Sequence, residues 1–88
     1  MTYALNVPGN VQRYLERLQP KVRDRIIERL ESLALDPLDA NTSKALHGEQ
    51  ASLRSSRLGN VRILYEILEE VRVVDINDIG PRGDVYKR

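Results

Sequence analysis

The stretch Arg57-Leu-Gly-Asn-Val-Arg-Ile-Leu-Tyr-Glu-Ile67 decides how the rest of this chain can fold. It contains a turn signal, Gly59-Asn60, followed by residues rich in β-branched and aromatic types, which is typical of a strand. Apolar side chains occupy one face at Val61, Ile63, Tyr65 and Ile67, and the other face carries Arg62, Leu64 and Glu66. Because both faces carry apolar residues, we expect a central strand. The Arg62 guanidinium must then contact an anion or reach water. We therefore expect the functional site on the strand face that carries Arg62.

Two amphipathic helices are predicted before this strand. The first begins after Asn10, the expected N-cap, and the second begins at Pro20, because proline suits the first turn of a helix. Asp36-Pro37 ends the second helix, because the residue before a proline disfavours the helical conformation. The charged residues between the apolar positions are expected to form solvated helix faces. The apolar stripes are Val11, Tyr14, Leu15 and Leu18 in the first helix, and Val22, Ile26, Ile27, Leu30, Leu33 and Ala34 in the second.

Three further strands are expected, at residues 3–7, 51–58 and 71–79. The second of these forms a hairpin with the central strand, and residues 38–49 have no pattern and are expected to form a loop. The fold class is therefore α+β: an N-terminal strand, two helices, then a three-stranded antiparallel meander, with both helices on one sheet face. The expected breaks and turns are Pro8-Gly9, Glu69-Glu70 and Gly80-Pro81.

Composition limits the possible function classes. A chain of 88 residues with 41% hydrophobic and 31% charged residues indicates one globular domain, residues 1–88. The absence of cysteine excludes disulfides and thiolate metal sites, and a lone histidine, His47, excludes a histidine-rich one. No secretion signal and no apolar run of about 18 residues are present, so we expect a cytoplasmic protein. A net charge of +1 gives little general attraction for nucleic acid, so such a function must rest on local clustering.

One local cluster of this kind is present. Between Arg54 and Tyr65 the chain has three arginines and no acidic residue, and Arg57 and Arg62 flank the hairpin turn. Arg82 and Tyr86 follow the last strand, where a chain reversal could bring them near. The guanidinium group of arginine binds two phosphate oxygens at once. A tyrosine among arginines suits proton transfer or stacking on an RNA base.

Other interpretations of these residues remain open. Surface arginines on strands commonly serve solubility or edge protection, and a tyrosine near the chain end often only packs. His47 beside a glycine is typical of an exposed loop. Asp75, Asp78 and Asp84 raise the possibility of a divalent-metal site, but Asp75 and Asp78 are three apart, which puts them on opposite faces of a regular strand. We therefore predict no metal site.

The sequence resembles the RelE/ParE superfamily of toxins from bacterial toxin–antitoxin systems, in particular its RelE-like members. Four segments carry the resemblance over almost the whole chain. They are Leu18-Gln-Pro20, Leu46-His-Gly48, Arg57-Leu-Gly-Asn-Val-Arg-Ile-Leu-Tyr65 and Gly80-Pro-Arg-Gly-Asp-Val-Tyr86. At the last three of these segments the family usually has Leu-Lys-Gly, Arg-Val-Gly-Asp-Tyr-Arg-Ile-Ile-Tyr and Gly-His-Arg-Arg-Asp-Val-Tyr.

The resemblance implies a metal-independent and cofactor-free endonuclease that cleaves mRNA on the ribosome by attack of a 2′-hydroxyl on the adjacent phosphate. It implies that Arg57 and Arg62 hold the phosphate. We also predict Arg54, from the same arginine cluster, as a further phosphate contact. Arg82 would stabilise the transition state or the leaving group, and Tyr86 would act on the attacking hydroxyl. The implied partners are the ribosome, mRNA and a cognate antitoxin, RelB-like or other, in a heteromeric complex.

Three positions depart from the family pattern. Ser55 stands where the family often has a basic residue, and Pro81 and Gly83 replace a histidine and an arginine of the tail. On a regular strand Arg54 faces the side opposite to Ser55. Two other functions therefore stay open: a ParE-like, non-enzymatic inhibitor of DNA gyrase, or an inactive partner of an antitoxin.

Overall fold

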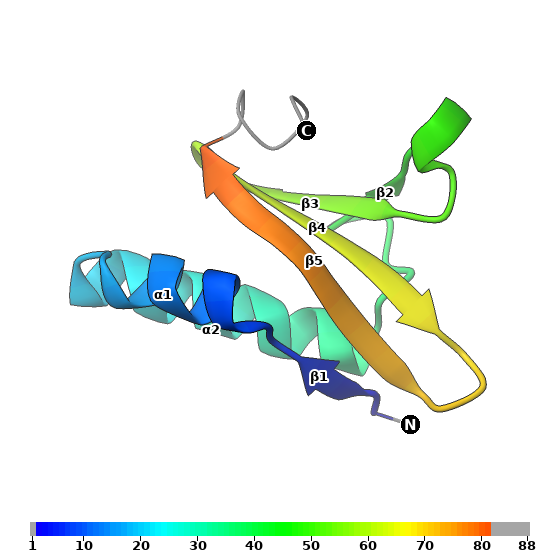
Figure 1. Cartoon of the computed structure of the whole chain (residues 1–88), viewed down its shortest axis with the longest axis horizontal. Helices are drawn as coiled ribbons and strands as arrows, with labels where there is room; N and C mark the ends of the chain where they lie inside the picture. The colour runs from blue at the N-terminus through cyan, green and yellow to red at the C-terminus, as the bar shows by residue number, and fades with distance from the viewer. Residues whose placement is uncertain (1, 82–88) are drawn as a thin grey trace.

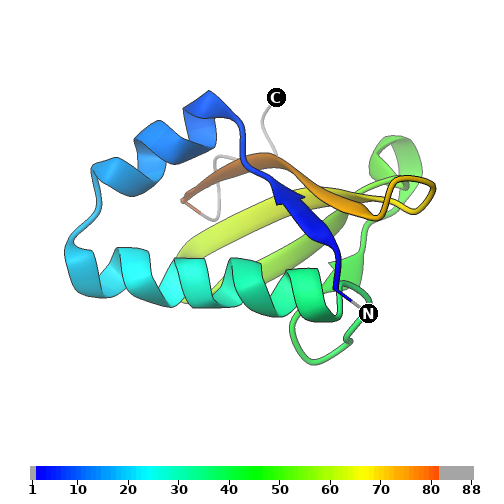
Figure 2. The same cartoon turned by 90° about the horizontal axis from the view of Figure 1, so that it is seen from below.

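The computed structural model describes residues 2–81 and has the expected α+β class. Helices α1 (Gly9–Glu16) and α2 (Pro20–Leu35) lie on the same face of one five-stranded sheet (Figures 1 and 2). The strand order is β1-β5-β4-β3-β2, with β1 parallel to β5 and the other pairs antiparallel. The strands are β1 (Ala4–Asn6), β2 (Lys44–Ala45), β3 (Arg54–Leu58), β4 (Val61–Leu68) and β5 (Val73–Pro81). No helix within residues 2–81 is long and apolar enough to cross a membrane.

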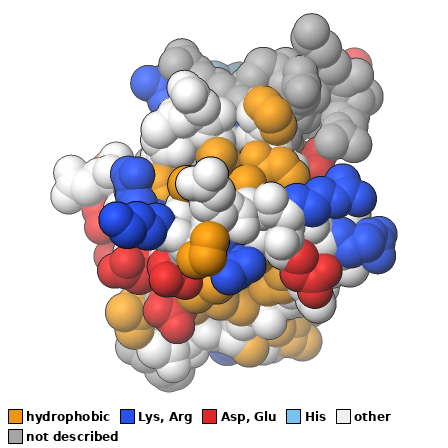
Figure 3. Space-filling model, turned by 90° about the vertical axis from the view of Figure 1, so that its left-hand side faces the viewer, with side chains coloured by type: hydrophobic (Ala, Val, Ile, Leu, Met, Phe, Trp, Pro, Cys, Tyr) orange, Lys and Arg blue, Asp and Glu red, His pale blue; other side chains and the backbone are white. Residues whose placement is uncertain are grey.

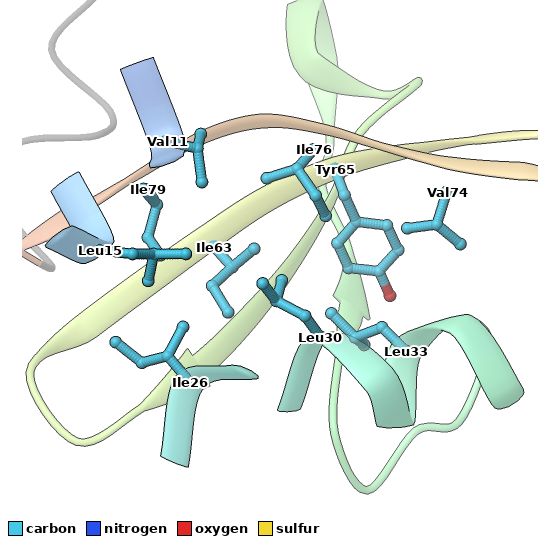
Figure 4. Close-up of a cluster of buried hydrophobic side chains, with 10 residues drawn as sticks. All are labelled: Val11, Leu15, Ile26, Leu30, Leu33, Ile63, Tyr65, Val74, Ile76 and Ile79. Atoms are coloured by element: carbon cyan, nitrogen blue, oxygen red, sulfur yellow. The ribbon is translucent and has the colours of Figure 1, made fainter. Parts of the chain in front are cut away.

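The core lies between the two helices and the sheet face that they cover. Side chains from both helices meet side chains from β4 and β5 (Figure 4). Ile63 and Tyr65 are fully buried there, which confirms the predicted apolar face of the central strand. The buried stripe of α2 is narrower than predicted, because Val22 and Ile27 are each 38% exposed. The central cluster consists of Val11, Leu15, Ile26, Leu30, Leu33, Ile63, Tyr65, Val74, Ile76 and Ile79.

The edge of this core reaches the surface at one end of the molecule. Figure 3 shows hydrophobic side chains there, between groups of basic and acidic ones. The partly buried side chains that pack against the core include those of Tyr14, Leu18, Leu58 and Val61.

The helix boundaries agree with the prediction except at the two ends of α1, which stops at Glu16, so that Leu18 lies outside the helix. Asn10 is not the N-cap: Pro8 occupies that position, and its carbonyl accepts the backbone N–H groups of Val11 and Gln12. Proline has the extended conformation that a cap residue needs, so the helix begins one residue before Asn10 without a side-chain cap. Pro20 is at the first turn of α2, and the helix ends at Leu35, as predicted.

The segment from residue 38 to residue 53 is more ordered than predicted. Instead of one loop, it contains the two-residue strand β2 and the 3₁₀ turn Gly48–Gln50. The following strand β3 begins at Arg54 rather than at residue 51. The predicted turn at Gly59 is confirmed, with a positive φ of 60° that favours glycine.

Strand β5 differs from the prediction at both ends. It begins at Val73, because Arg72 closes the preceding turn in the left-handed region with φ 56°. At the other end Gly80 and Pro81 do not break the strand but pair with Arg62 and Val61 of β4. A proline is tolerated there because β1 pairs with β5 only at residues 73–75, so Pro81 lies beyond the β1 ladder.

A β-bulge also corrects the predicted faces of two aspartates. Leu64 pairs with Asp78 but Tyr65 pairs with Ile76, so Asn77 is the extra residue. Asp75 and Asp78 therefore lie on the same sheet face, opposite to the helices, rather than on opposite faces. Within residues 2–81 no group of three or more histidine, aspartate or glutamate side chains could hold a metal ion.

Candidate functional site

The hairpin of β3 and β4 directs its arginines to different sides of the sheet. Arg57 is the cross-strand partner of Arg62, and both lie on the face that the helices leave uncovered, here called the open face. Arg54 pairs with Tyr65, whose side chain is in the core, and therefore lies on the helix-covered side. The structure thus brings Arg57 and Arg62 together and separates Arg54 from them.

A cavity of about 230 Å³ opens beside the two arginines. Among residues 2–81 its charged side chains are Lys44, Arg57 and Arg62, and none of the acidic residues in this range lines it. Arg62 is 6% exposed, whereas Lys44 and Arg57 are exposed. The remaining lining residues are small or polar: Ala40, Asn41, Thr42, Ser43 and Ser55.

The cavity has the chemistry of an anion site. Three basic side chains face a hollow that no carboxylate of the described part of the chain lines, so a negatively charged group there is attracted from several sides. Arginine binds phosphate oxygens through two parallel N–H groups, and Lys44 adds a point charge. The volume lies below the roughly 300–1,000 Å³ typical of pockets that enclose drug-sized ligands, so the cavity suits the phosphate groups of a larger molecule that extends beyond it.

One wall of the cavity is a loop that buried side chains hold in place. The Tyr65 hydroxyl donates to the Pro37 carbonyl at 2.6 Å, and the Ser56 hydroxyl donates to the Thr42 carbonyl at 2.7 Å. Ser56 in turn accepts a hydrogen bond from Arg29 of α2 at 2.9 Å. These contacts fix the segment from Pro37 to Lys44 against the sheet and so give the cavity a defined shape.

Arg54 belongs to the same anchoring network. Its Nη2 and Nε donate to the Ser43 hydroxyl at 2.9 and 3.1 Å, and Nε also lies 3.3 Å from the Tyr65 hydroxyl. Arg54 therefore contacts the cavity wall from behind. This placement does not support a phosphate contact shared with Arg57 and Arg62.

The charge of the side chains on the open face changes from basic to acidic across the sheet. Lys44, Arg57 and Arg62 occupy the half formed by β2, β3 and the adjacent part of β4. Glu66 and Asp75 are cross-strand partners in the other half, where Asp78 also lies. Asn6 donates to the Asp75 carboxylate at 2.6 Å. A polyanion is thus attracted to one half of the face and repelled by the other.

A second polar cluster lies at the far end of the sheet. The Tyr3 hydroxyl lies 2.8 Å from the Glu69 carboxylate, and Arg72 contacts both residues at 3.1 Å. The hydrogen bond to Glu69, together with burial, raises the pKa of Tyr3. Because the Arg72 guanidinium also lies over the Tyr3 ring, the cluster ties the β4–β5 turn to the N-terminal segment.

Two of the predicted site residues lie outside the described part of the chain. The structure also adds one residue to the site that the sequence did not predict. Arg82 and Tyr86 lie outside the described residues. Lys44 was not predicted, although it lines the same cavity as Arg57 and Arg62. Its segment has no periodicity, and only the pairing of Lys44 with Ser55 reveals that it reaches the open face.

Comparisons with known proteins agree on one family. A family model described as the ParE toxin of a type II toxin–antitoxin system, parDE, matches residues 9–86. Toxin RelG of Mycobacterium tuberculosis is 32% identical over 89 aligned positions, which cover the whole of both chains.

Solved structures with the same fold include two toxin–antitoxin complexes. The RelBE2 complex of M. tuberculosis contains a chain that is 29% identical, with a TM-score of 0.80 over 93% of this chain and 100% of that one. A chain of the RelE–RelB complex of Pyrococcus horikoshii is 25% identical, with a TM-score of 0.76 over 96% of this chain and 99% of that one.

Proposed function

We propose that this chain, which belongs to the ParE family of toxins from type II toxin–antitoxin systems within the RelE/ParE superfamily, acts as a RelE-like endonuclease that cuts mRNA on the ribosome. The observation that carries the proposal is the cross-strand pair of Arg57 and Arg62 at the cavity of the open face. The similarity to RelG and to the toxin chains of the RelBE2 and RelE–RelB complexes supports it. A ribosomal target also places the activity in the cytoplasm.

In the proposed reaction the ribose 2′-hydroxyl attacks the adjacent phosphorus and the bond to the 5′-oxygen breaks, which leaves a cyclic phosphate. Arg57 and Arg62 bind the phosphate oxygens, whose negative charge grows in the transition state. The sequence resemblance assigns the removal of the hydroxyl proton, or its orientation, to Tyr86. It assigns the stabilisation of the transition state or of the leaving oxygen to Arg82.

A cognate antitoxin is the second proposed partner. The RelBE2 and RelE–RelB structures are complexes of a toxin with its antitoxin, which supports a heteromeric complex for this chain as well. A RelB-like or other antitoxin that covers the basic half of the open face, or displaces the tail, would block access to Arg57 and Arg62. Inhibition then needs no change in the fold of the toxin.

Primer extension on mRNA from cells briefly induced for this protein tests the proposal. We expect cuts confined to translated codons, and their loss in Arg62→Ala. Arg25→Ala, at an exposed arginine of α2 that does not line the cavity, is the matched control and should cut like the wild type. Circular dichroism of the purified Arg62→Ala variant establishes whether it is folded, and Arg62→Lys tests the need for a two-pronged donor.

The match to a ParE family model favours one rival function, a non-enzymatic inhibitor of DNA gyrase. Intact mRNA together with growth arrest and DNA damage would establish this rival and overturn the nuclease. Intact mRNA with normal growth would leave an inactive partner of an antitoxin.

A further inference from the structure

We propose that Lys44 is a substrate-contacting residue that holds a second backbone phosphate of the RNA, next to the phosphate bound by Arg57 and Arg62. This inference rests on the proposed function and extends it to a residue outside the predicted site. It assigns the cavity two neighbouring phosphate positions rather than one.

The register of β2 and β3 places Lys44 at the right distance. Lys44 is the cross-strand partner of Ser55, and Arg57 is two residues further along β3 on the same face. Lys44 and Arg57 are therefore diagonal neighbours, which are about 7–8 Å apart and within reach of long side chains. Arg57 and Arg62 face each other directly and can share one phosphate, while the ammonium of Lys44 reaches the next position along the cavity.

The residue between them keeps this path open. Ser55 lines the cavity and is 3% exposed, so only a hydroxymethyl group separates the lysine from the arginine pair.

The backbone of Lys44 is held in position before any ligand binds. The preceding residue Ser43 accepts two hydrogen bonds from Arg54, and the Thr42 carbonyl accepts one from Ser56. Within residues 2–81 no hydrogen bond or ion pair engages the Lys44 ammonium. The charge is thus carried by an anchored backbone and is available to a ligand, which lowers the ordering cost of binding.

The salt dependence of binding tests this assignment without requiring cleavage. The probe is a short single-stranded RNA with 2′-O-methyl riboses, which lack the attacking hydroxyl and cannot be cut. Each phosphate neutralised on a single strand contributes about −0.7 to the slope of log K against log salt concentration. We expect Lys44→Ala to make this slope shallower by about 0.7, and Lys44→Arg to retain the slope of the wild type.

Lys21→Ala provides the matched control, because Lys21 is an exposed lysine of α2 on the other side of the sheet. It should leave the slope unchanged. An unchanged slope in Lys44→Ala would overturn the second phosphate position, and so would failure of the wild-type chain to bind the probe. If Lys44→Ala makes the slope shallower while induced cells show no cuts in mRNA, the phosphate site stands and only the nuclease is overturned.

Discussion

Arg57 and Arg62 are directly opposite each other across the β3–β4 hairpin. Two like charges in this relationship destabilise a sheet, since the side chains of cross-strand partners lie close together. Arg62 is also buried, so part of its hydration is lost. Arg57 is exposed, so its repulsion with Arg62 is a cost that an anion bound between the two side chains would relieve.

Arg57→Gln should therefore raise the stability of the free chain while it lowers toxicity. We expect a gain of about 0.2–1 kcal/mol in the free energy of unfolding, equivalent to a few degrees in Tm for a domain of this size. Thermal unfolding at low salt measures it. The gain should shrink in about 1 M salt, where repulsion is screened within about 3 Å. A lower Tm for Arg57→Gln at low salt would contradict the argument.

Tyr65→Phe should destabilise the fold, because it removes a hydrogen bond that holds the cavity wall in place. The Tyr65 hydroxyl is buried, donates to the Pro37 carbonyl at 2.6 Å and lies 3.3 Å from Nε of Arg54. Leaving a buried partner unsatisfied costs about 1–3 kcal/mol. Denaturant unfolding with an unchanged m value measures this loss.

Tyr14→Phe is the control for this substitution. Tyr14 is half-buried, burial raises its pKa, and its hydroxyl makes no hydrogen bond within residues 2–81. Its loss should change the free energy of unfolding by less than about 0.5 kcal/mol. Equal losses in both variants would show that the hydroxyl of Tyr65 is not an anchor.

Arg54→Met separates a structural role from a phosphate contact. Arg54 donates to Ser43 from behind the cavity, and hydrogen bonds to charged groups contribute about 1.5–3 kcal/mol. We expect a loss of stability of that order and no change in the salt slope for the non-cleavable RNA. A slope shallower by about 0.7 would instead assign Arg54 to the RNA backbone.

The helices and the central hairpin could be predicted because each has a local signal. Periodic apolar residues defined α1 and α2, and Gly59 marked a turn that needs a positive φ. The alternation along β3 also indicated that Arg54 faces away from Ser55, as the register shows. These features depend on residues close together in the sequence.

Features that depend on distant partners could not be predicted. β2 has only two residues and exists because it pairs with Ser55 and Arg54. The bulge at Asn77 shifts the phase of β5 so that Ile76 and Ile79 both face the core. In the sequence the bulge corresponds to two polar residues between two isoleucines. This pattern can be recognised as a bulge only once the pairing with β4 is known. Lys44 was missed for the same reason.

Moving the charge of Lys44 to its cross-strand partner tests whether position on the open face decides activity. Lys44→Ala should weaken growth arrest. The double variant Lys44→Ala with Ser55→Lys should restore it, because side chains of cross-strand partners start about 4.5–5.5 Å apart and a lysine at either position reaches the same cavity. The matched control is Lys44→Ala with Ala45→Lys, which has the same net charge but places the lysine on the opposite sheet face. Restoration by both double variants would mean that net charge alone matters, and restoration by neither would show that the anchored backbone of Lys44 is itself required.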